Sequence, residues 1–317
     1  MWVYIKKRSR IFYNEILCSA GILITLAFFI GIKVFSNIYQ GAKIGTAIRS
    51  GVLGSLFFII GYFSLALFAV DEDKIPRRNV EAQTEKRSLL LWVVLAYTAF
   101  IFLKNIDFVQ RAGGLDGTPV MSFIPGYTWL MQFIDNKIAI PISNLWSVIK
   151  PAQVGQIIKG FLFCVLIPFL IFRKLGYTFK SRIFSMKHSR AAWPIIFIYL
   201  VMVLTNGLRV EAIWFVAYAF LHPALQEEFF DRGIIVPAMA KFFKNTGNII
   251  VVSSLIFTIL HFPDFFFRIY KGNMLATVSE MSSIMLSGIL YAYGYRKTGS
   301  LMPMMIIHAL EDATFLF

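Results

Sequence analysis

SGVLGSLFFIIGYFSLALFAV, residues 50–70, contains no charged side chain. A transmembrane helix needs roughly 20 consecutive, mostly apolar residues, so this run is long enough to cross a membrane. Comparable apolar runs recur along the chain, at residues 16–36, 88–103, 158–172, 193–207, 211–240, 248–262, 274–295 and 300–316. We therefore predict an all-α fold, a polytopic transmembrane helical bundle of about eight or nine spans.

The composition agrees with an integral membrane protein surrounded by lipid. Hydrophobic residues make up 58% of the chain and charged residues only 15%, whereas a soluble domain carries about 25% charged residues. The net charge of +14 does not indicate a nucleic-acid partner, because Lys and Arg lie in short clusters between apolar runs. The two cysteines, Cys18 and Cys164, lie inside apolar runs without metal-ligand spacing.

Basic clusters predict the orientation in the membrane. They lie at residues 1–10, 71–87 and 173–190. The positive-inside rule places these three segments, and with them the N-terminus, in the cytoplasm. This arrangement suits a multi-pass protein of the cell (inner) membrane. The segment 104–157 then faces the other side, and we expect an interfacial helix at 138–149 within it.

One apolar run is longer than a single span requires. Residues 211–240 contain His222-Pro223. Proline cannot donate the helical hydrogen bond and clashes with the preceding turn, so a kink or break is expected there.

A cluster of charged residues follows that break. In Gln226-Glu227-Glu228-Phe229-Phe230-Asp231-Arg232 two adjacent carboxylates point about 100° apart on a helix. Glu228 and Arg232 stand four residues apart, the spacing at which a carboxylate and a guanidinium meet. We expect that pair to support the structure of the site and to leave Glu227 directed elsewhere. An ionisable residue inside a span is costly and indicates a partner or a function.

Two of the four histidines lie in the apolar runs that follow this cluster. His261 ends an almost wholly apolar run, and His308 lies four residues before Asp312 in the last run. Either histidine alone is usually a packing residue. If these segments pack against the one that contains Glu227, they form a polar cluster enclosed by apolar walls. Glu280 also lies in a span, where interhelical bonding is the favoured interpretation.

Three motifs together resemble one family. Glu227, Glu228 and Arg232 form EExxxR, Phe257 and His261 form FxxxH, and His308 and Asp312 form an HxxxN-like element. Their order and spacing resemble the CPBP family of intramembrane peptidases, which includes the type II CAAX prenyl proteases and bacteriocin-processing enzymes. The resemblance covers about residues 211–317.

The resemblance implies a glutamate-dependent endopeptidase that cleaves a membrane-anchored or lipidated protein or peptide, with no cofactor. It implies that Glu227 and His261 activate water, and that His308 and Asp312 face the oxyanion. Asp312 departs from the usual Asn of the family. An ionised Asp repels an oxyanion, so Asp312 either is protonated or orients His308. We accordingly divide the chain into N-terminal transmembrane segments and loops, 1–192, and a catalytic helical core, 193–317.

Two alternatives use the same residues. Glu227, His261 and His308 are ligand types found at catalytic zinc sites, although HExxH is absent and the three come from separate segments. Zinc is therefore an alternative cofactor that we do not favour. A scaffold or transporter without catalysis is the other alternative, but the first five spans are nearly free of ionisable residues, which favours one localised site.

Overall fold

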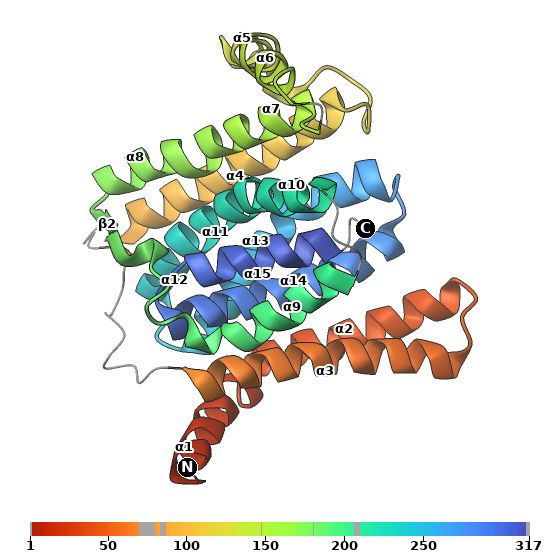
Figure 1. Cartoon of the computed structure of the whole chain (residues 1–317), viewed down its shortest axis with the longest axis vertical. Helices are drawn as coiled ribbons and strands as arrows, with labels where there is room; N and C mark the ends of the chain where they lie inside the picture. The colour runs from red at the N-terminus through yellow and green to blue at the C-terminus, as the bar shows by residue number, and fades with distance from the viewer. Residues whose placement is uncertain are drawn as a thin grey trace.

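The computed structural model describes residues 2–69, 80–82, 87–146, 148–179, 181–205 and 210–314. In this part of the chain the fold is a bundle of long helices with one short pair of strands (Figure 1). The N-terminal half contains α1 (Trp2–Phe12), α2 (Ala20–Tyr39), α3 (Ile44–Phe68), α4 (Arg87–Arg111), α5 (Tyr127–Phe133), α6 (Ile140–Ser143), α7 (Pro151–Gly160) and α8 (Ile167–Lys174). The C-terminal half contains α9 (Trp193–Thr205), α10 (Val210–Ala219), α11 (Leu225–Phe230), α12 (Val236–Phe242), α13 (Thr246–Pro263), α14 (Met274–Thr298) and α15 (Met302–Thr314).

The all-α transmembrane fold is confirmed. Within the described ranges, six helical segments are long and apolar enough to cross a membrane: 20–39, 44–68, 87–111, 151–174, 246–269 and 274–298. Shorter helices occupy the remaining predicted runs, at 193–205, 210–242 and 302–314. Each apolar run of the sequence therefore contains a helix, and a protein with several such helices is an integral membrane protein.

Local signals explain where the central helices begin and end. The Asn245 side chain caps α13 by accepting a hydrogen bond from the Gly247 amide (2.7 Å), and Asn273 caps α14 in the same way. α14 ends at Gly299, whose φ of +67° is the left-handed conformation that glycine adopts without strain. The predicted break is present: His222 has φ −155° and ψ 118°, so α10 and α11 are separate helices.

Two boundaries in the segment 104–157 differ from the prediction. α4 continues to Arg111 instead of ending near 103, because Asp107 is buried and pairs with Arg111 one turn later (2.6 Å). The interfacial helix expected at 138–149 is also misplaced. Helical structure runs from Tyr127 to Ser143, and Asn144 and Leu145 form a turn.

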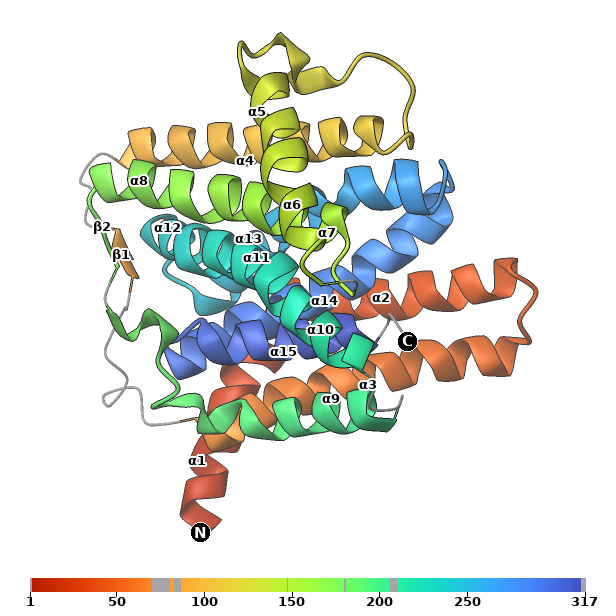
Figure 2. The ribbon, with the colours of Figure 1, turned by 45° about the horizontal axis from the view of Figure 1, so that its top comes forward.

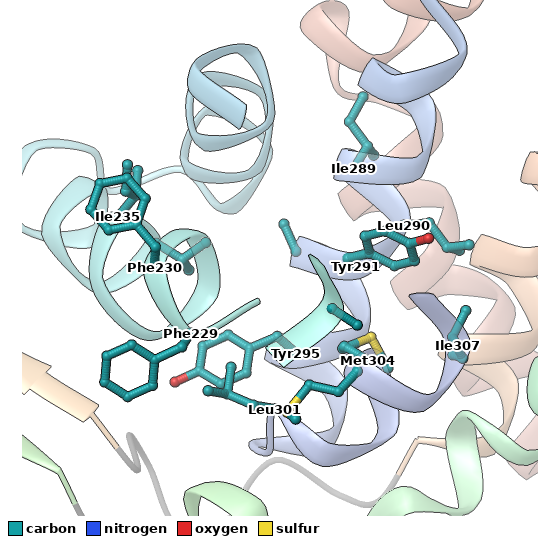
Figure 3. Packing of buried hydrophobic residues seen from close by; sticks show 14 of the residues in the cluster. Phe229, Phe230, Ile235, Ile289, Leu290, Tyr291, Tyr295, Leu301, Met304 and Ile307 are labelled. Atoms are coloured by element: carbon teal, nitrogen blue, oxygen red, sulfur yellow. The ribbon is translucent and has the colours of Figure 1, made fainter. Parts of the chain in front are cut away.

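The core of the C-terminal half packs α11 against α15, the following residues 231–235 against α14, and α12 against α13. Figure 3 shows Phe229 of α11 beside Tyr295 of α14, with Leu301 below Tyr295 and Met304 to its right. Gly288 allows a close approach of α14 to α13, since a Cβ there would lie 3.1 Å from atoms of Phe257 and Ser254. This close packing fixes the helices that carry the predicted site.

The described parts of the three basic segments, residues 2–10, 80–82 with 87, and 173–179 with 181–190, gather at one end of the bundle, and the remaining basic residues of 71–87 lie outside the described ranges. The strand β1 (Val80–Ala82) pairs antiparallel with β2 (Tyr177–Phe179), which joins the second segment to the third. The Tyr4 hydroxyl donates to the Leu67 carbonyl (3.0 Å), and Arg190 donates to the Phe68 carbonyl (3.2 Å). α1 and the strands lie on the left of Figure 2, and the α2–α3 turn lies on the right. The side of the membrane that this end faces stays a prediction.

Candidate functional site

A cavity of about 230 Å³ lies between α4, α5, α7, α11 and α13. Its walls are largely apolar and aromatic, formed by residues such as Phe163, Phe230 and Leu260. Glu227 and His261 lie on this wall, with about a quarter of each side chain exposed. An enclosed apolar site with a few convergent polar groups is the usual form of a ligand or active site.

Glu227 and His261 face each other across the cavity wall. The distance from Glu227 Oε2 to His261 Nε2 is 3.3 Å. His261 Nδ1 lies 2.9 Å from the Phe257 carbonyl, which only accepts, so Nδ1 carries a proton. In the neutral imidazole Nε2 is then an acceptor like the facing carboxylate oxygen. Because Glu227 Oε2 forms no hydrogen bond, both atoms are available to a donor placed between them.

Glu228 connects two residues that the sequence treats separately. It is fully buried, and its Oε1 lies 3.2 Å from Arg232 Nη1 and 2.9 Å from His308 Nδ1. The predicted ion pair with Arg232 is therefore present. The same carboxylate also accepts the Nδ1 proton of His308, which fixes the orientation of that imidazole.

Arg232 is enclosed on every side. Its guanidinium lies over the rings of Phe257 (4.4 Å) and Tyr291 (5.1 Å), and Nη2 donates to the Gly288 carbonyl (3.1 Å). His308 stacks on the other aromatic partner, Tyr291, at 4.9 Å between ring centroids. The cation thus holds α11, α13 and α14 together around the histidines.

Asp312 does not hold His308 by a hydrogen bond. Its Oδ2 lies 3.7 Å from His308 Nε2, beyond hydrogen-bond distance, and forms no hydrogen bond. His308 Nε2 is also 3.8 Å from Glu227 Oε2. The four residues Glu227, His261, His308 and Asp312 are therefore brought together, but Glu228, not Asp312, takes the orienting position at Nδ1.

Other polar residues of the site were not predicted from the sequence. Lys104 and Asn105 line the cavity although they were expected to lie in a loop beyond a span. Asp231 also lines it, and its spacing of four residues from Glu227 was a usable signal. Glu311 is enclosed beside the site, where the hydroxyls of Ser287 and Tyr291 donate to it.

Gln226 and Glu280 form contacts that hold helical segments together. Gln226 accepts from His222 Nδ1 (2.6 Å) and donates to the carbonyls of Ile157 and Leu221, which secures the broken segment. Glu280 pairs with Lys33 of α2 (3.5 Å), an interhelical contact as expected.

The described ranges contain no group of three or more His, Cys, Asp or Glu side chains arranged to hold a metal ion. The zinc alternative concerns Glu227, His261 and His308, and a chelator experiment distinguishes it from catalysis without a metal.

Comparison with known proteins gives one match. A family model described as Rce1-like type II CAAX prenyl endopeptidase matches residues 209–314, about a third of the chain. That range includes Glu227, Glu228, Arg232, His261, His308 and Asp312. No curated protein and no solved structure shows a significant match.

Proposed function

We propose that this chain is a glutamate-dependent intramembrane endopeptidase, because residues 209–314 match the model of the Rce1-like type II CAAX prenyl endopeptidase family. The observation that carries the proposal is the Glu227 carboxylate, 3.3 Å from His261 on the wall of a cavity enclosed by membrane helices. The match to the family model supports peptidase activity, and the residue roles that follow are our proposal.

Glu227 is proposed as the general base. A water molecule beside the pair donates one hydrogen bond to Glu227 Oε2 and one to His261 Nε2, so its oxygen lone pair is directed into the cavity. As that oxygen attacks the scissile carbonyl carbon, the proton passes to Glu227. The Phe257 carbonyl holds the His261 ring through Nδ1 and keeps Nε2 directed at the water.

His308 is proposed to stabilise the oxyanion. Glu228 accepts from Nδ1, so only Nε2 is left to face the substrate. Nε2 donates when the ring is doubly protonated, a form that the buried Glu228 carboxylate at Nδ1 stabilises. An aligned donor of this kind is worth about 100-fold to 1000-fold in rate.

The substrate is proposed to be a membrane-anchored or lipidated protein or peptide. The cavity is apolar on most of its wall and lies among helices that cross the lipid, so a substrate held in the bilayer reaches it without leaving the membrane.

Glu227→Gln tests the proposal. The substitution preserves the shape of the side chain but removes its basicity, so we expect purified protein that is folded and does not cleave an S-farnesylated CAAX peptide in lipid vesicles. Glu280→Gln is the matched control, because Glu280 is another glutamate within a span but pairs with Lys33 outside the cavity. Its rate should equal that of the unmodified protein.

Two experimental outcomes would contradict the proposed mechanism. Cleavage by Glu227→Gln protein at the unmodified rate contradicts the base assignment and favours a scaffold or transporter role. Loss of cleavage after treatment with a chelator, restored by zinc, favours a metal-dependent peptidase with the same side chains.

A further inference from the structure

Asp231 is a second carboxyl group on the wall of the same cavity. It follows Glu227 by four residues, so the two side chains lie on one side of the segment that begins with α11. Asp231 is 2% exposed and lines the cavity beside His261 and Phe230. None of its oxygens forms a hydrogen bond or ion pair with the described residues, and Oδ1 is completely enclosed.

Among the neighbouring cations, Arg232 and Lys159 are engaged elsewhere, and Lys104 forms no ion pair with Asp231 within the described residues. Arg232 binds Glu228 and the Gly288 carbonyl between two aromatic rings. Across the cavity Lys159 pairs with Asp135 (2.6 Å). The charged and titratable groups around Asp231 come from several elements. Glu227, Glu228 and Arg232 lie on its own segment, His261 and Asp264 on α13 and the turn after it, Lys104, Asp107 and Arg111 on α4, Cys164 between α7 and α8, and His222 before α11.

Asp231 differs in this respect from the other acidic residues of the cavity. Asp107 pairs with Arg111, Asp264 pairs with Arg268, and Glu227 faces His261. Burying a carboxylate without a cation or hydrogen bonds is so costly that the group keeps its proton instead. Asp231, as a carboxylic acid, and Glu227, as a base, therefore lie one helical turn apart on the cavity wall.

We propose that Asp231 is the general acid that protonates the leaving amine in the peptidase reaction. The inference rests on the proposed function. Water adds to the carbonyl carbon while Glu227 takes its proton; the C–N bond then breaks, and its electron pair accepts the proton of Asp231. The products are a carboxylic acid and an amine, and Asp231 regains a proton from Glu227, which restores both groups.

The protonation state can be tested without any substrate. Infrared spectra of purified protein in lipid at neutral pH should contain a carboxylic-acid C=O band that shifts in D₂O and is lost in Asp231→Asn. Asp264→Asn is the matched control: it makes the same substitution on the same cavity, at a residue that has a cationic partner, and should keep the band. A spectrum that does not change between unmodified and Asp231→Asn protein overturns the proposal.

The catalytic role is tested with an S-farnesylated CAAX peptide and its ester analogue at the scissile bond. Without protonation an ester expels an alkoxide, whereas an amide must expel the much more basic anion RNH⁻. Asp231→Asn should therefore lower kcat for the amide by about 100-fold to 10,000-fold and kcat for the ester by about tenfold or less. KM should change little. Asp231→Glu should recover part of the amide activity, because it restores the proton.

The controls separate this inference from the proposed function. Glu227→Gln should lose amide and ester cleavage alike, and Glu280→Gln, at a residue outside the cavity, should lose neither. If Glu227→Gln is inactive but Asp231→Asn cleaves the amide normally, or loses amide and ester cleavage equally, the acid assignment is wrong and the peptidase assignment stands.

Discussion

At the scale of single residues, Glu228 joins the structural and the chemical parts of the site. The sequence pairs it with Arg232 through their spacing, and the structure adds a bond to His308 Nδ1 at 2.9 Å. One buried carboxylate thus compensates the Arg232 charge and binds His308 Nδ1, which leaves Nε2 on the side of Glu227, 3.8 Å from its Oε2. A local spacing rule finds the first contact but not the second, because His308 lies 80 residues away.

Asp312→Asn is the sharpest test at this scale. Because Glu228 already orients His308, a carboxylate at position 312 is not needed for that purpose. We expect the substitution to retain or increase peptide cleavage, since an amide donates to an oxyanion whereas a carboxylate repels it. Steady-state rates of the purified variant decide this, and a large loss of kcat in a folded protein would show that the carboxylate is required.

At the scale of helices, the cluster around Arg232 holds α11, α13 and α14 together. Removing one partner of a buried ion pair leaves an uncompensated charge, which costs about 3 to 5 kcal/mol. We expect Arg232→Ala to lower the yield and the thermal stability of the detergent-purified protein accordingly.

The double variant Glu228→Gln/Arg232→Met separates stability from chemistry. It removes both charges and keeps most of the volume, so folded yield should recover relative to Arg232→Ala. Cleavage should not recover, because His308 no longer binds a carboxylate. A double variant that folds no better than the worse of Glu228→Gln and Arg232→Met would contradict the pairing.

At the scale of the whole molecule, the basic segments share one end of the bundle and predict its orientation. Cysteines introduced at Arg10 and Lys187 should react with a membrane-impermeant thiol reagent from the same side, which the positive-inside rule assigns to the cytoplasm. Cysteines at Ala42 and Asp116 should react from the opposite side. Labelling in intact cells and in inverted vesicles measures this, and Arg10 and Lys187 reacting from different sides would refute the shared end.

Much of the fold follows from the sequence alone, because the cost of exposing polar backbone to lipid makes an uninterrupted apolar run a helix. The apolar runs gave the helices, His222-Pro223 gave the break, and the spacing of Glu228 and Arg232 gave their ion pair. Each of these rests on interactions within a few residues of the chain.

Only the tertiary structure decided how the helices combine their polar groups. The apolar run ends at residue 103, where charged residues begin, and the sequence therefore predicts the end of a span there. Lys104 and Asn105 nevertheless continue α4, because a cavity accommodates their side chains. The partner of His308 and the isolation of Asp231 likewise depend on which helices meet. The physical reason is that hydropathy reports the average surroundings of a segment, whereas a buried polar side chain depends on the few atoms that other segments place beside it.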